Sequence, residues 1–207
     1  MDFWLDQLRE RWGMLALAAL AAIGAFGWWS GRPLRQLPGI LAPEDPAQAE
    51  PEPVAPWTYR NHTLTPLARF EIHARVLSAE RYRFDRASEL SPVDLALGWG
   101  PMSDSRILEA FQIRQQDRWY FWRSAHMPIP EADVISHSAN MHMIPASAAV
   151  ARRLEAAREG QVVRLKGQLV RADGKDGWHW ISSLSRADTG DGSCEVIWVE
   201  WAQVADR

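Results

Sequence analysis

His137 and His142 lie five residues apart in the segment HSANMHMIP. Neutral imidazole is a common ligand for zinc and similar ions, so this closeness first suggests a metal site. In regular structure, however, the spacing places the pair on opposite faces of a strand, or about 140° apart around a helix. Convergence would need a loop or bulge and a third ligand, such as His126, His179 or a carboxylate. We therefore predict no metal site, and we predict no cofactor.

The same segment carries a polar stripe, because Ser138, Asn140 and His142 share one face if the segment is a strand. Such a stripe could bind a ligand or a partner together with His137. In an enzyme, His142 with Asn140 would supply polar catalysis. A structural role, with these groups satisfied inside the fold, stays open.

A second polar segment, RADTGDGSCE, contains Asp188 and Asp191. Asp188 begins the Asp-Thr-Gly triplet of aspartic proteases, but a single copy between polar residues does not match those enzymes. The segment also has too few regularly spaced oxygens for a calcium loop. We predict a hairpin turn whose two aspartates are binding candidates, with Asp188 as the carboxylate candidate of a hydrolase.

Cys194 is the single cysteine, so the chain has no intrachain disulfide, which is compatible with either side of a membrane. The acidic residues beside it would raise the pKa of its thiol, whereas a nucleophile needs a lowered pKa.

Charge and aromatic content limit the possible partners. From Trp57 onward, 17 Arg and two Lys balance 19 Asp and Glu, so this part lacks the basic surface of a nucleic-acid binder. The segment Arg81–Arg86, with two aromatics among its cations, therefore fits an edge strand better than a phosphate site. Eight of the 12 Trp lie in this part. Exposed ones could stack on envelope sugars, although core packing is expected for most.

Positioning these residues requires a folded domain, and the chain before that domain looks like an anchor. Residues 13–29 form an uncharged run of 17 positions with Trp12 at one end and Trp28 and Trp29 at the other. This pattern predicts an uncleaved transmembrane helix after an N-terminal tail, residues 1–12. The flanking arginines are balanced, so the preference for a periplasmic domain is slight. Residues 30–56 hold seven of the 13 Pro and predict an acidic spacer.

Residues 57–207 then predict one soluble α+β domain with a mainly antiparallel curled sheet or partial barrel, of which an oligonucleotide-binding barrel is one possible form. Alternation predicts strands at 69–77, 119–123, 161–170, 177–184 and 194–201. Capping signals predict helices over 91–98, over 104–114 and after Ser147.

The chain also resembles a family of uncharacterised, single-pass membrane-anchored bacterial proteins. The strings SPVDLALGWGPM from Ser91, HSANMH from His137, WISS from Trp180 and Cys194-Glu195 carry this resemblance, together with Arg83-Phe84-Asp85. It implies a bacterial inner-membrane protein with a similar anchor and domain. It implies no activity and transfers no catalytic residue.

These observations favour a membrane-tethered, non-enzymatic binding or assembly module of the bacterial envelope, with a protein partner. Its groove is expected between His137–His142 and the Asp188–Glu195 turn. A membrane-anchored hydrolase, with or without a metal ion, and an envelope-glycan binder are the alternatives.

Overall fold

The computed structural model describes Trp12, Gly24 and residues 14–15, 17–22, 31–51 and 53–206. Among these residues no helix is both long and apolar enough to cross a membrane. Much of the expected tail and of the run 13–29 lies outside the described residues, so the anchor stays a prediction. The chain divides into the units Met1–Pro33 and Leu34–Arg207. The second unit contains the folded domain.

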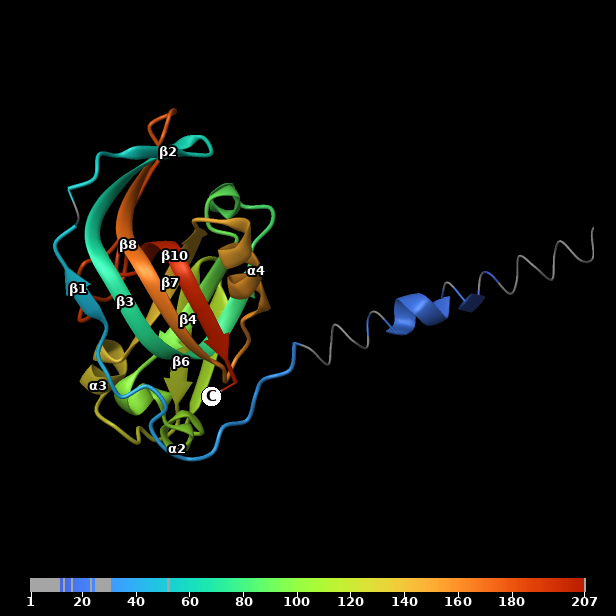
Figure 1. The fold of residues 1–207 in the computed structure, drawn as a ribbon. Helices are drawn as coiled ribbons and strands as arrows, with labels where there is room; N and C mark the ends of the chain where they lie inside the picture. The colour runs from blue at the N-terminus through green and yellow to red at the C-terminus, as the bar shows by residue number, and fades with distance from the viewer. Residues whose placement is uncertain are drawn as a thin grey trace, which may run out of the picture. The chain divides into compact units, whose positions relative to one another are not determined.

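The domain has the expected α+β class, with a mainly antiparallel sheet and short helices. Five strands of the described chain close on themselves in the order β3-β4-β7-β10-β8-β3. Closure is possible because the 20-residue strand β3 pairs with β8 along its first part and with β4 along its last. β7 and β10 run parallel, and the other neighbours are antiparallel. The strands are β3 (His62–Arg81), β4 (Val93–Gly98), β7 (Ser138–Pro145), β8 (Val162–Gly174) and β10 (Glu195–Ala205) (Figure 1).

Shorter elements are added around these strands. β1 and β2 pair with β3, β9 pairs with β8, and β5 and β6 form a separate hairpin between β4 and β7 in the chain. Their bounds are β1 (Ala47–Ala49), β2 (Trp57–Tyr59), β5 (Phe111–Gln116), β6 (Trp119–Ser124) and β9 (His179–Ile181). The helices are η1 (Arg86–Glu89), η2 (Gly100–Ser103), α2 (Ser105–Leu108), α3 (Glu131–Ser136) and α4 (Ala148–Ala156).

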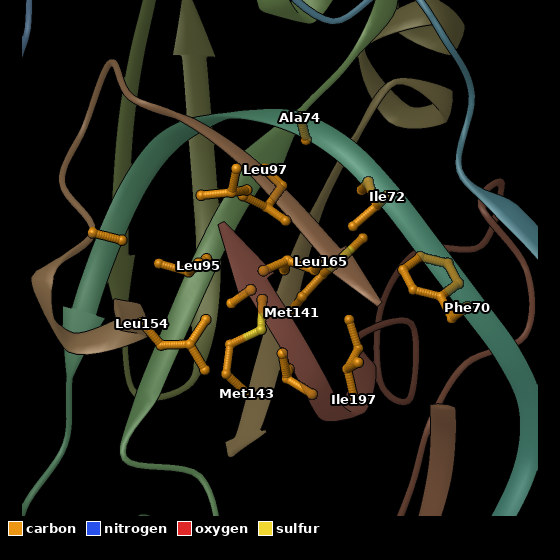
Figure 2. Close-up of a cluster of buried hydrophobic side chains, with 14 of the residues drawn as sticks. Phe70, Ile72, Ala74, Leu95, Leu97, Met141, Met143, Leu154, Leu165 and Ile197 are labelled. Atoms are coloured by element: carbon orange, nitrogen blue, oxygen red, sulfur yellow. The ribbon is translucent and has the colours of Figure 1, made fainter. Parts of the chain in front are cut away.

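The main core lies on the inner face of the closed sheet, where alternate residues of each strand are buried. Figure 2 shows β3 arching over this cluster, with Ile72 and Ala74 on the arch. Leu154 of α4 joins the cluster. α4 begins as expected at Ser147, whose side chain accepts a hydrogen bond from the Val150 amide. This packing fixes which face of β7 is turned away from the core.

Two expected helices are wrong. Residues 91–98, with a Ser-Pro start that imitates a helix cap, contain strand β4. All six β4 residues are buried, because Leu95 and Leu97 face the core while Ala96 packs in another buried cluster under the β5–β6 hairpin. Burial of both faces removes the polar alternation by which a strand is recognised. Residues 104–114 hold only the one-turn helix α2, after which β5 begins at Phe111.

The segment expected to be a spacer, residues 30–56, is partly bound to the domain. The Leu34 amide donates to the Glu159 carbonyl at 2.8 Å, and the Ala42 amide donates to Ser103 Oγ at 3.1 Å. Ala42 is fully buried, and β1 pairs with β3. We call residues 34–49 the strap. Proline content had favoured an extended chain, and an extended chain can lie along a folded surface when its backbone groups find partners there.

Candidate functional site

A cleft of about 190 Å³ opens between the β5–β6 hairpin and the loop 182–194, which joins β9 to β10. One end of β7 forms its third wall. The cleft is lined by Trp119, Tyr120, Trp122, Ile135, Ser138, Ala139, Asn140, Ser185, Arg186, Asp188, Thr189, Gly190, Ser193, Cys194 and Glu195.

Hydrogen bonds hold the hairpin against the outward face of β7. Ser138 Oγ donates to the Val134 carbonyl at 2.6 Å, so the Tyr120 hydroxyl, 2.6 Å away, donates to Ser138. Burial raises the pKa of Tyr120 to about 12, which keeps this donor protonated. Asn140 Oδ1 accepts from Gln115 at 2.6 Å. The stripe on β7 therefore fixes the hairpin as one wall of the cleft.

The opposite wall is organised around Ser183. Its hydroxyl donates to Asp188 Oδ2 at 2.7 Å and accepts from the Ser185 amide at 2.9 Å. Gly190 and Gly192 have φ values of 86° and 84°, as the turn at the end of this loop requires. Glycine turn positions are therefore present, but the expected hairpin is wrong, because β9 and β10 each pair with β8 and not with each other. Asp188 both holds this loop through Ser183 and lines the cleft.

An ion pair lies where this wall meets β10. Glu195 is 1 % exposed, and its Oε1 lies 2.8 Å from Nε of Arg186. Burial raises the pKa of Glu195 to about 8, although the Arg186 charge acts in the opposite direction. Glu195 Oε2 and Arg186 Nη1 are buried and have no hydrogen-bond partner among the described residues. The pair therefore keeps one unused acceptor and one unused donor.

Cys194 is unsuited to nucleophilic chemistry. Its pKa is raised to about 12, mainly by burial and further by Glu195, Asp94 and Asp188. The thiol stays protonated at neutral pH, and Asn140 Nδ2 lies 3.9 Å from its sulfur. The direction expected from the neighbouring acids is correct, whereas the largest cause is burial.

His142 does not line the cleft and lies in a separate, buried cluster next to the β5–β6 turn. Its Nδ1 lies 2.9 Å from Oδ2 of the fully buried Asp94, and the Trp180 ring covers the imidazole at 4.3 Å between centroids. Arg118, from the β5–β6 turn, pairs with Asp94 at 2.8 Å and with Asp85 at 2.6 Å. This cluster joins the hairpin tip to β4 and to the segment before η1.

The structure thus brings together half of the six sequence-derived binding candidates. Ser138, Asn140 and Asp188 line one cleft, whereas His137, His142 and Asp191 do not. His137 ends α3, where its Nδ1 lies 2.8 Å from the Asp133 carbonyl oxygen. Within the described chain, no group of three or more His, Cys, Asp or Glu is arranged to hold a metal ion.

Sequence reasoning missed that Arg186 pairs with the buried Glu195. The signal was present, because Glu195 is in phase with Ile197 and Val199, which face the core. A carboxylate in phase with buried residues at a strand end needs a compensating cation. Trp119 and Trp122 were grouped with the packing tryptophans, but both line the cleft. Four others pack together around a second buried cluster: Trp57, Trp178, Trp180 and Trp198.

Comparisons with protein-family models, curated proteins and solved structures find no match for this chain. The resemblance to a bacterial membrane-anchored family therefore stays an expectation.

Proposed function

We propose that this protein is a membrane-tethered, non-enzymatic binding module whose ligand occupies the cleft between the β5–β6 hairpin and the loop 182–194. The apolar run 13–29 supplies the tether in this proposal, and the bacterial envelope, with the domain on the periplasmic side, is the setting that the sequence favours.

The position of the cleft on the sheet supports a binding role most directly. Numbered along the chain, the barrel strands have the order 1-2-3-5-4-1, with α4 between the third and fourth strands. We take this as the oligonucleotide-binding type of barrel, which binds oligonucleotides or oligosaccharides on strands 2 and 3 and the loops next to them. The cleft uses the outward face of the third strand, β7, and the loop between the fourth and fifth strands.

The arrangement of the polar candidates disfavours the hydrolase alternative. In the hydrolase alternative, His142 and Asn140 would act together with the carboxylate of Asp188. Asn140 and Asp188 line the cleft, but His142 is 2 % exposed and lies against Asp94 and Trp180. A general base must come within hydrogen-bond reach of the reacting group, and His142 does not meet this condition for a ligand in the cleft.

Site-specific photo-crosslinking tests the proposed site. A photoreactive amino acid replaces Thr189 in the cleft, or Gln112 on the exposed side of β5, in the full chain in bacterial membranes. We expect an adduct from position 189 and none from position 112. The adduct should be lost in Trp119→Ala and kept in Phe121→Ala, since both aromatics are exposed on β6 but only Trp119 lines the cleft. Equal adducts from both positions, or none from position 189, would refute the proposal.

A further inference from the structure

Strand β6 has an open edge. β5 and β6 form a two-stranded sheet, so in the described chain β6 pairs with β5 alone. Gln116 and Trp119 are paired directly across a two-residue turn with positive φ at both positions. Residues that flank such a turn bond to each other, and hydrogen-bonded pairs then alternate along the hairpin. The backbone N–H and C=O groups of Tyr120 and Trp122 therefore point away from β5.

The cleft lies along this open edge. Tyr120 and Trp122 both line it, whereas Ile113 and Gln115, which are paired with them on β5, do not. Within the described residues, Tyr120 and Trp122 make no backbone hydrogen bond outside the hairpin. An open strand edge binds extended peptides, because a peptide supplies N–H and C=O groups at the matching spacing. Nucleic acids and sugar chains lack this repeat of backbone amides, so the edge favours a peptide.

Charge restricts the kind of peptide. The loop 182–194 carries two carboxylates, Asp188 and Asp191, and one cation, Arg186. Arg186 pairs with Glu195 of β10, while Asp188 accepts from a serine hydroxyl and has no ion-pair partner in the described structure. β6, β7 and α3 add no charged residue to the lining. The cleft is therefore negative overall, which favours a ligand group with a positive charge.

The exposed edge of the cleft also suits such a group. Trp119 is 37 % exposed and lines the cleft. Arginine and lysine cations are attracted to the face of a Trp ring, arginine more often than lysine. A volume of 190 Å³ is about six times the ~30 Å³ that a water molecule takes in the liquid. That space suits one long side chain, while the peptide backbone stays at the strand edge.

These observations point to one kind of partner. We infer that an extended segment of a partner protein adds to the open edge of β6 as a third strand, and that one basic side chain of this segment enters the cleft towards Asp188. Backbone pairing then supplies affinity, and the cleft selects the side chain. This inference rests on the proposed function, because it names the partner of the same cleft.

Three acetylated heptapeptide amides test the charge preference. Their sequences are TVTRTVT, TVTQTVT and TVTETVT, so they share a high strand propensity and differ in the central side chain alone. The full chain in detergent micelles is titrated with each peptide by isothermal calorimetry. We expect saturable binding of the arginine peptide, about fivefold weaker binding of the glutamine peptide and still weaker binding of the glutamate peptide, because one partly exposed charge pair contributes about this factor.

Amide hydrogen exchange, resolved to single residues, tests the strand addition. The arginine peptide should slow exchange at the amides of Tyr120 and Trp122. It should leave unchanged the amides of Ile113 and Gln115, which lie on the other edge of the hairpin. A peptide held by its side chains alone would not protect one edge in this pattern.

Two variants connect the charge preference to the loop. Asp188→Asn keeps an oxygen acceptor for the Ser183 hydroxyl and should weaken binding of the arginine peptide about fivefold. Glu200→Gln, outside the cleft, removes the same charge and should leave binding unchanged. If Asp188→Asn does not fold, the ranking of the three peptides on the unchanged chain decides the same point.

The outcomes separate the two proposals. Equal binding of the three peptides, or binding without protection of Tyr120 and Trp122, would overturn the inference and leave a binding cleft. The same holds if no peptide binds while the adduct from position 189 persists. If no peptide binds and position 189 gives no adduct, the proposed function is overturned as well.

Discussion

At the scale of single residues, Glu195 connects the cleft with the barrel interior. It begins β10 at a position in phase with the core residues Ile197 and Val199, yet it also lines the cleft. Its carboxyl group therefore loses hydration on folding, which explains the direction of its pKa shift.

This shift predicts a pH dependence of stability. The pKa of Glu195 rises from 4.5 in the unfolded chain to about 8 in the folded domain. Between these values the folded state holds more protons than the unfolded state, so the free energy of unfolding falls as pH rises from about 4.5 to 8. Glu195→Gln should remove this part of the fall, measured by urea unfolding at pH 5 and pH 8.5. Glu200→Gln should keep it, and equal slopes in all three proteins would contradict the prediction.

Arg118 is the residue that holds the hairpin tip. Its guanidinium is the strong partner of the fully buried Asp94, so Arg118→Ala leaves a carboxylate in the interior without that cation. We expect a loss of about 3 kcal/mol or more in unfolding free energy, as for other broken buried pairs. Arg171→Ala, which removes an exposed pair with Asp173, should change little. Urea unfolding measures both, and similar losses in the two variants would show that burial does not set the effect.

The turn that contains Arg118, and the contacts that this turn makes, could not be predicted from the sequence. Asp117 and Arg118 form the β5–β6 turn with φ values of 52° and 70°, where Asn-Gly would be the usual signal. The polar stripe on β7 could be predicted because alternation along a strand depends on local spacing. The partners of that stripe could not, because Gln115, Tyr120 and Arg118 reach it only when the hairpin folds back.

At the scale of elements, local signals succeeded where one face of an element stays exposed. β8 alternates between buried and exposed residues over 163–167, and α4 has a capping serine and a buried stripe. They failed at β4, because the hairpin covers the face that would otherwise be polar. They also failed for the strap, since its hydrogen-bond partners are more than 60 residues away in the chain.

Gly160 makes the contact between the strap and the domain possible. A Cβ atom at this position would overlap the Leu34 carbonyl, and its φ is +88°. Gly160→Ala should therefore destabilise the domain by more than the ~1–2 kcal/mol expected for an L-residue in this backbone region. It should also make the strap a fast site of limited proteolysis. Gly177 has a φ of +87° with open space around its Cα. Gly177→Ala should show the backbone cost alone, and a protected strap in Gly160→Ala would contradict the prediction.

At the scale of the whole molecule, the strap shortens the spacer that the proposed tether was expected to have. Residues 30–56 were expected to be a free spacer, but Leu34 is already hydrogen-bonded to the domain. Four residues, 30–33, join the apolar run to Leu34, and their contour length is at most about 14 Å at ~3.5 Å per residue.

Two insertions test this arrangement in the full chain in lipid vesicles. The chain carries Cys194→Ala and a fluorophore on Gln112→Cys, which is exposed on the β5–β6 hairpin, with acceptor dyes in the lipid headgroups. Ten Gly-Ser residues inserted after Gly31 should lower energy transfer, because they lengthen the segment between the proposed anchor and Leu34. The same insertion after Pro53 should leave transfer unchanged, since β1 and β2 on either side both stay paired with β3. A fall in transfer with both insertions would mean that the strap leaves the domain surface at a membrane. Unchanged transfer with both would mean that residues 13–29 do not anchor the chain.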